Sequence, residues 1–99
     1  MAAPAKLAEA EVAARLATLP GWTIEGGKLH RAFVFRDFVE AWGFMSGAAL
    51  AAEAMGHHPE WSNVWNRVTV DLTTHDADGL TALDFDLAAR MQALAARPA

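Results

Sequence analysis

The sequence predicts an α+β fold, with an antiparallel four-stranded sheet covered on one face by helices in the order α-β-β-α-β-β-α. Two stretches place apolar residues at the spacing of three and four that marks a helix, a capping pair predicts a third helix, and segments with the alternation of strands lie between them. Gly26-Gly27 separates the first two strand segments and Asn66 the second two, and such short turns are typical of hairpins. The order of the strands within the sheet does not follow from this pattern.

The first part of the chain reads as a helix followed by a hairpin. From about Leu7 to Leu19 apolar residues recur at helical spacing, and Pro20-Gly21 then ends the helix. The segments 22–25 and 28–35 are predicted to pair as two strands. In the second strand three apolar residues share one face by period two: Leu29, Phe33 and Phe35. Arg31 lies on the same face, and the pattern does not explain it.

A long central helix follows the hairpin. Asp37 opens it, and Glu40 three residues later completes a pattern that resembles a capping box. The helix is expected to run to about Met55, where Gly56 ends it in the manner usual for helix C-termini. Five residues at intervals of three and four are predicted to share the stripe that faces the sheet: Phe38, Trp42, Met45, Ala49 and Ala52. Further apolar residues lie outside this stripe: Val39, Phe44 and Leu50.

The last part of the chain reads as a second hairpin and a final helix. A short strand around Asn63–Trp65 is predicted to pair with a longer one, Arg67–Thr74. In the longer strand valine and leucine alternate with polar residues, which indicates that one face is buried and the other polar. A loop leads to Thr81, which with Asp84 at the third helical position is predicted to cap a helix that runs to about Ala96.

Composition limits the classes of function. The 99 residues are predicted to form one domain, 1–99. Hydrophobic residues make up 54% of the chain, and a chain this short buries only about 60–70% of its unfolded surface, so we expect some apolar residues to serve a homodimer or homotetramer interface. The net charge is −4 and no run of Lys or Arg occurs, so we expect no binding to nucleic acid.

Cysteine usage and hydropathy bear on compartment. The chain has no cysteine, which excludes a disulfide scaffold, a thiolate nucleophile and a Cys-based zinc site. The N-terminal stretch lacks the apolar core of a signal peptide, because Glu9 and Glu11 interrupt it. No segment approaches the ~18 uninterrupted apolar residues of a membrane span. We therefore expect a cytoplasmic protein without membrane contact.

The stretch GHHPEW places two adjacent histidines directly after the long helix. Pro59 favours an extended backbone at His58, and in extended backbone successive side chains point to opposite sides. His57 and His58 are therefore expected to approach a ligand from different directions. Glu53 precedes His57 by four residues, which predicts that the two share a face at the end of the helix, and His75 follows the last predicted strand.

Three hypotheses account for these histidines. An imidazole at a helix C-terminus interacts favourably with the helix dipole and needs no further role. A metal site would use Glu53, His57 and His75, but adjacent histidines before proline match none of the common ligand spacings, so we predict no metal. Proton transfer is the third hypothesis, because imidazole has an unperturbed pKa of ~6.5 and serves as acid and as base near neutrality.

The spacing of these residues extends into a longer signature. The pattern E-x3-H-H-P, which begins at Glu53, is followed by Trp65 after five residues, His75 after nine more and Asp84 after eight more. This signature closely resembles that of the pterin-4a-carbinolamine dehydratase family. The resemblance continues through FVFRDFVEAWGFM before the histidines and GLTALDFDLA after them, and it covers roughly Leu7 to Met91.

The resemblance implies the fold predicted above and a specific activity. Members of this family remove water from a 4a-hydroxytetrahydropterin to give the quinonoid dihydropterin, without a metal or an organic cofactor. Aromatic amino-acid hydroxylases produce that hydroxypterin, so a functional link to such an enzyme is also implied. Family members form dimers and tetramers. The alternative is a non-catalytic pterin-binding module or a coactivator-like module that binds a protein partner.

The resemblance also implies site residues. The catalytic histidines correspond to His57, His58 and His75. The implied acidic companions and pterin contacts are Glu53, Pro59, Trp61, Thr74, Asp76, Ala77 and Asp84. For Asp84, helix capping and a site role remain equal alternatives, and Trp61 and Trp65 are interpreted as core or cleft-wall aromatics. His30 receives no role and is expected to be exposed. Gly56 departs from some family members, which have an acidic residue before the paired histidines.

Overall fold

The computed structural model of the protein describes residues 4–96, and the two ends of the predicted 1–99 domain, 1–3 and 97–99, lie outside the described residues. The predicted fold class and the order α-β-β-α-β-β-α are confirmed. The elements are α1 (Glu9–Leu16), β1 (Thr23–Glu25), β2 (Lys28–Val34), α2 (Phe38–Met55), β3 (Glu60–Val64), β4 (Arg67–Leu72), the 3-10 turn η1 (His75–Ala77) and α3 (Ala82–Ala95). Within the described residues no helix is long and apolar enough to cross a membrane.

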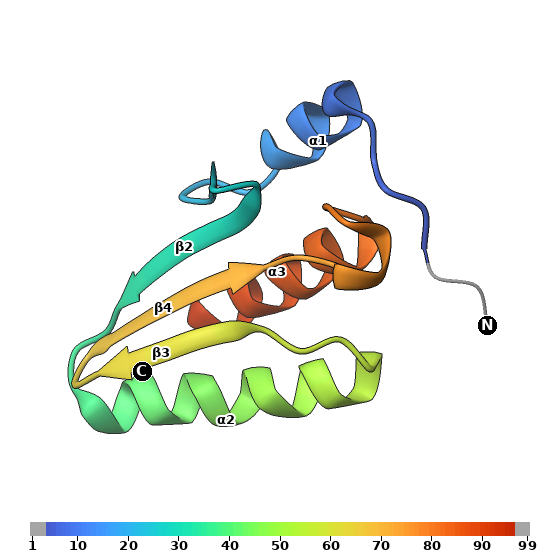
Figure 1. Cartoon of the computed structure of the whole chain (residues 1–99). Helices are drawn as coiled ribbons and strands as arrows, with labels where there is room; N and C mark the ends of the chain where they lie inside the picture. Colours follow the sequence, from blue (N-terminus) through green and yellow to red (C-terminus); the bar gives the residue numbers. More distant parts are fainter. Residues whose placement is uncertain (1–3, 97–99) are drawn as a thin grey trace.

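The sheet is antiparallel throughout and has the strand order β1-β2-β4-β3. The longest ladder joins β2 to β4, so these two strands form the centre, and β3 is an edge strand. Helices α2 and α3 pack against each other on one face of the sheet (Figure 1). Helix α1 lies apart from them, and the N–H of Leu7 just before it donates to the carbonyl of Leu80 at 2.8 Å.

The core lies between the sheet and the helix pair. The buried residues of β4 are Val68, Val70 and Leu72, which confirms the predicted alternation in this strand. Leu29 and Phe33 of β2 oppose Leu72 and Val68 in register and are buried with them. This apolar layer supplies most of the free energy that drives folding.

Arg31 lies on the helix-facing side of β2, opposite Val70. Its guanidinium donates to the carbonyl of Pro20 at 3.0 Å and to the side-chain oxygen of Gln92 on α3. The guanidinium also lies 4.4 Å from the ring centroid of Phe33, within the range of a cation–π contact. The charged residue that the alternation left unexplained therefore ties the start of the sheet to α3.

The stripe predicted for α2 is wrong for three of its five residues. The buried residues are Ala41, Phe44, Ala48 and Ala52, whereas Phe38, Trp42 and Ala49 are exposed and Met45 is half-buried. Phe44, predicted to lie outside the stripe, packs in the core. Alanines on the inner face allow α2 to approach α3 closely, and because apolar residues surround the whole helix, their periodicity does not identify the buried face.

Several predicted boundaries also differ. Helix α1 is shorter than the predicted span of 7–19, because Thr18 and Leu19 already form a turn that accommodates Pro20. Strand β3 begins at Glu60 rather than near Asn63, since its whole length pairs with β4. Strand β4 ends at Leu72, and the predicted loop after it contains η1.

The turn between β3 and β4 contains Asn66, as predicted. The side-chain amide of Asn66 donates to the carbonyl of Phe35 at 2.9 Å, and the N–H of Phe35 donates back to the carbonyl of Asn66 at 2.8 Å. These bonds hold the turn beside the start of α2. Trp65, expected in the core or a cleft wall, is exposed in this turn with φ of 49°, so that interpretation is wrong.

Candidate active site

The GHHPEW stretch forms the connection from α2 to β3. Gly56 has the left-handed φ of 64° that glycine adopts readily, and it ends the helix as predicted. After this turn His57 no longer follows the axis of α2, and the N–H of His57 donates to the carbonyl of Ala52. The predicted alignment of Glu53 with His57 on one helix face is therefore wrong, because the helix ends between them.

His57 is buried and bonded to Asp84. Its Nε2 lies 2.6 Å from Oδ1 of Asp84, a residue 27 positions later at the start of α3. The His57 side chain is 10% exposed and that of Asp84 is 0% exposed, so this imidazole–carboxylate pair is shielded from solvent. A pair in such an environment interacts more strongly than the same pair in water.

The second oxygen of Asp84 is held by two other donors. The hydroxyl of Thr74 donates to Oδ2 at 2.8 Å, and the N–H of Thr81 donates to the same atom at 2.9 Å. The hydroxyls of Thr74 and Thr81 are themselves 2.8 Å apart. A carboxylate is an acceptor only, and all its partners here can donate. Asp84 therefore completes the capping box of α3, as predicted, and also bonds His57.

His58 lies on the exposed side of the connection and bonds to a different carboxylate. Its Nε2 is 2.8 Å from Oε1 of Glu53 on the last turns of α2. Both side chains are exposed, so the strength of this pair depends on salt. The two adjacent histidines thus have separate acidic partners, one buried and one in solvent.

His75 is the first residue of η1 and bonds to Glu60, a residue that the sequence analysis did not single out. The Nε2 of His75 lies 3.0 Å from Oε2 of Glu60, and the other oxygen of Glu60 accepts from Lys28 Nζ at 2.5 Å. The pKa of the Glu60 carboxyl is lowered, chiefly by the hydrogen bond from Lys28 and further by the one from His75. Glu60 lies inside the GHHPEW stretch, and its position two residues after His58 is the feature of the sequence that could have identified it as a site residue.

The three histidines line one cavity of about 340 Å³, a volume within the usual range for small-molecule sites. Thr74, Asp76 and Gly56 also line it. An adjoining cavity of about 330 Å³ shares Thr73 and His75 with the first and is lined also by Lys28 and Gly27. His75 therefore stands between two hollows.

The remaining predicted contact residues lie elsewhere. Pro59 and Ala77 are neighbours of the cavity in sequence but do not line it. Trp61 is half-buried and packs against the core, as one of its two interpretations held. His30, expected to be exposed, has a side chain only 22% exposed, and its Nδ1 lies 2.9 Å from Oδ1 of Asp71 on the open face of the sheet. That expectation is wrong because strand pairing places His30 directly opposite Asp71.

No three histidine, aspartate or glutamate side chains among residues 4–96 are grouped so that they could hold a metal ion. The alternative ligand set of Glu53, His57 and His75 is divided between different partners. Glu53 bonds His58, whereas His57 bonds Asp84.

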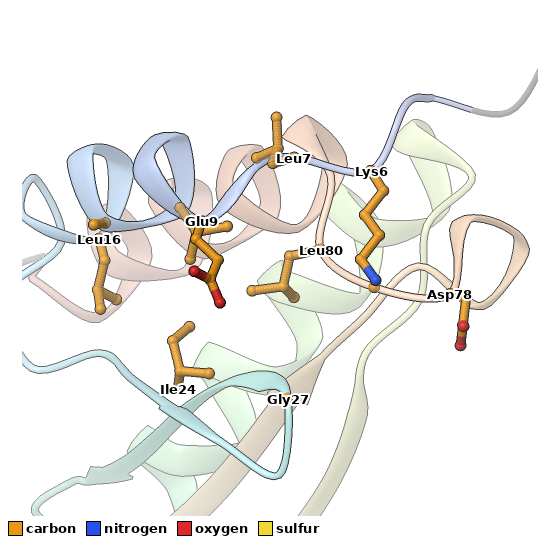
Figure 2. Close-up of a pocket in the computed structure, with 11 residues that line it drawn as sticks. Lys6, Leu7, Glu9, Leu16, Ile24, Gly27, Asp78 and Leu80 are labelled. Carbon is orange, nitrogen blue, oxygen red and sulfur yellow. The ribbon is translucent and has the colours of Figure 1, made fainter.

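A larger cavity of about 430 Å³ lies between α1 and the first hairpin (Figure 2). Its lining is mainly aliphatic and includes Leu7, and Leu16, Ile24 and Leu80 are directed toward it. Lys6, Glu9 and Asp78 are the charged residues of its lining. No histidine lines this cavity, so it lacks the imidazoles that mark the smaller one.

Most of the chain matches a known protein family. The family model for pterin 4 alpha carbinolamine dehydratase matches residues 5–94. The chain belongs to the pterin-4-alpha-carbinolamine dehydratase family. A protein from Solibacter usitatus assigned as a pterin-4-alpha-carbinolamine dehydratase is 60% identical over 91 residues, which cover 92% of this chain and 96% of the relative. One from Novosphingobium aromaticivorans is 56% identical over 90 residues, covering 89% and 94% of the two chains.

Two solved structures resemble the fold. A transcriptional coactivator/pterin dehydratase from Brucella melitensis superposes with a TM-score of 0.88 at 47% identity, covering 91% of this chain and 98% of that one. A pterin dehydratase-like protein identified as a RuBisCO assembly factor in the alpha-carboxysome superposes with a TM-score of 0.68 at 25% identity, covering 79% and 93%. Proteins with this fold thus carry different functional descriptions.

Proposed function

We propose that this protein is a 4a-hydroxytetrahydropterin dehydratase in which His57, His58 and His75 perform acid–base catalysis. The observation that carries the proposal is that all three imidazoles line one cavity and each bonds through Nε2 to its own carboxylate. Membership of the pterin-4-alpha-carbinolamine dehydratase family supports the same substrate class.

The proposed reaction needs only proton transfers. An acid protonates the 4a-hydroxyl, the C4a–O bond breaks with loss of water, and the N5 lone pair forms the new C=N bond. A base then removes the N5 proton, which leaves the neutral quinonoid dihydropterin. Imidazole suits both steps near neutral pH, and a positioned acid or base contributes roughly 100- to 10,000-fold to the rate.

The carboxylates are proposed to act through the histidines. A ring that donates Nε2–H to a carboxylate keeps Nδ1 for the substrate, and the negative charge stabilises the imidazolium that forms when Nδ1 takes up a proton. Asp84 and Glu53 would then orient His57 and His58 rather than contact the pterin themselves. Thr74 and Asp76 line the cavity and are the proposed polar contacts to the ring.

We also propose that the protein assembles as a homodimer or homotetramer through the outer face of α2. Trp42, Val39 and Leu50 of this helix are 57%, 78% and 74% exposed. Phe38 stacks on Trp42 with ring centroids 6.4 Å apart, which extends the apolar surface. Exposed apolar surface of this kind marks an interaction site.

Turnover of a 4a-hydroxytetrahydropterin tests the proposed activity. The purified protein is expected to accelerate formation of the quinonoid dihydropterin well above the spontaneous rate, and such turnover would fit a role in recycling the cofactor of an aromatic amino-acid hydroxylase. Binding of the pterin without acceleration would indicate a non-catalytic pterin-binding module. A protein that neither binds the pterin nor accelerates the reaction would instead have a protein-partner role, as the descriptions of the two solved relatives suggest for those proteins.

A further inference from the structure

Lys28, Glu60 and His75 form a chain of contacts across the open face of the sheet. Lys28 begins β2 and Glu60 begins β3, while β4 lies between these strands. The Lys28 ammonium therefore reaches across β4 to bond Oε1 of Glu60 at 2.5 Å. Oε2 of Glu60 bonds Nε2 of His75 at 3.0 Å, so each carboxylate oxygen has one partner.

His75 depends on this contact more than His57 depends on its own. The His57 ring is buried, and packing around it restricts its rotation. The His75 side chain is 77% exposed and belongs to a 3-10 turn of only three residues. Its one side-chain hydrogen bond within residues 4–96 is the bond to Glu60. The orientation of the ring and the choice of its protonated nitrogen therefore rest on that carboxylate.

We infer that Glu60, held in place by Lys28, is the positioning residue for His75. The carboxylate accepts from Nε2–H and leaves Nδ1 of His75 for proton transfer in the cavity. The expected effect of Glu60 on catalysis rests on the proposed dehydratase function. The expected orientation and tautomer of the His75 ring do not depend on turnover. Lys28 and His75 both line the adjoining cavity, and His75 also lines the cavity that holds the other two histidines.

The charges around Glu60 favour its ionised form. Lys28 and His75 lower the pKa of the carboxyl, and Glu60 raises the pKa of Lys28 in turn. Asp71 on β4 lies opposite Glu60 in register and also raises the pKa of Lys28. Asp71 is itself bonded to His30 of β2, and Glu25 of β1 lies 3.6 Å from the same imidazole. Among these charged groups, the ammonium of Lys28 is the one that bonds the Glu60 carboxylate directly.

Glu60→Gln tests the inference, because it keeps the shape of the side chain and replaces one acceptor oxygen by an NH2 donor. We expect kcat to fall by about 10- to 100-fold with KM changed less than about twofold, since the loss concerns proton transfer and not binding. In a His75→Ala background the same substitution should change kcat by less than about twofold, because Glu60 acts only through that ring. Glu40→Gln, at a half-buried carboxylate paired with Arg36 near the start of α2, is the matched control and should leave kcat unchanged.

Nitrogen-15 NMR of the His75 ring provides the readout that does not need turnover. The parent protein should show the neutral Nε2–H form, and Glu60→Gln should shift the ring toward the Nδ1–H form or a mixture of both. The ratio of the activity at pH 5 to the activity at pH 8 should be lower in Lys28→Met than in the parent protein. The reason is that without Lys28 the carboxyl of Glu60 protonates at a higher pH.

Separate results would overturn the inference and the proposed function. An unchanged His75 tautomer in Glu60→Gln would refute the positioning role, whatever the activity of the parent protein. An equal loss of kcat from Glu60→Gln with and without His75 would refute it as well, since the carboxylate would then act by another route. A parent protein that shows the predicted tautomer and no turnover would refute only the dehydratase function.

Discussion

Asp84 accepts a hydrogen bond from His57 at 2.6 Å with one carboxylate oxygen and one from the N–H of Thr81 at 2.9 Å with the other. The first bond orients an imidazole of the candidate site, and the second completes the cap of α3. Because one buried carboxylate serves both, the geometry of the site and the stability of the helix are coupled. A change at Asp84 must therefore be measured as a change in both.

Asp84→Asn should lower stability and activity together. The amide keeps one acceptor but presents a donor to the remaining partners, so we expect a loss of about 1.5–3 kcal/mol in the free energy of unfolding. The same change disfavours the Nε2–H form of His57, and kcat should fall by roughly 100-fold or more. Urea unfolding and turnover assays measure the two effects. Asp86→Asn, at an exposed position on the same helix, is the control, and an equally active folded Asp84→Asn would contradict the assigned role.

His57→Ala and His75→Ala should each lower kcat/KM by roughly 100- to 10,000-fold in a dehydratase assay. The double variant should lose less than the product of the two, because both groups act on one transition state. His30→Ala should change the rate by less than about twofold, since His30 lines neither histidine cavity and would supply no acid–base contribution. Unfolding curves must first show that each variant is folded; near-normal turnover by both single variants would refute the acid–base assignment.

Gly56→Ala should destabilise the protein through the backbone alone. The residue has φ of 64°, and a Cβ built there meets no atom within 4 Å, so no steric clash contributes. The left-handed conformation costs an L-residue about 1–2 kcal/mol, which urea unfolding can resolve. Gly56→Asn should lose less, because asparagine tolerates this conformation better. Equal stability of all three proteins would show that the turn relaxes.

The contribution of the Lys28–Glu60 pair to stability should depend on pH in a defined window. The pKa of Glu60 is lowered in the folded protein, so its contribution is present above the ordinary value of 4.5 and is lost as the pH falls through the folded value. The pKa of Lys28 is raised, so its contribution is present below the ordinary value of 10.5 and is lost as the pH rises through the folded value. The Tm of Lys28→Met should therefore differ from that of the parent at pH 7, and the difference should shrink as the pH falls below 4.5. A difference that stays constant as the pH is lowered would point to packing by the Lys28 stem.

The outer face of α2 predicts the assembly state. Light scattering at micromolar concentration should give at least twice the monomer mass for the parent protein. Trp42→Glu with Leu50→Glu should lower that mass to a monomer, because each places a charge on exposed apolar surface. Ala89→Glu, on the exposed side of α3, should leave the mass unchanged. A monomeric parent protein would refute the proposed interface.

The features that the sequence determined by itself are local ones. Alternation in β4, Gly26-Gly27 between β1 and β2, and the capping pair Thr81 and Asp84 each predict their element correctly. These signals are reliable because backbone conformation, hydrogen bonding and side-chain direction within a few residues depend mainly on those residues. The clustering of histidines at element ends was likewise readable, and it led to the residues that line one cavity.

Only the tertiary structure decided which distant groups meet. Strand order placed β4 between β2 and β3 and so brought Lys28 to Glu60, 32 residues away. Packing of α3 on the sheet brought Asp84 to His57. The left-handed turn at Gly56 placed His58, and not His57, within hydrogen-bond distance of Glu53. The buried face of α2 also depended on its neighbours, because close approach to α3 selects alanines over larger apolar residues. Long-range pairings of this kind follow from how layers pack against one another, and no local spacing in the chain records them.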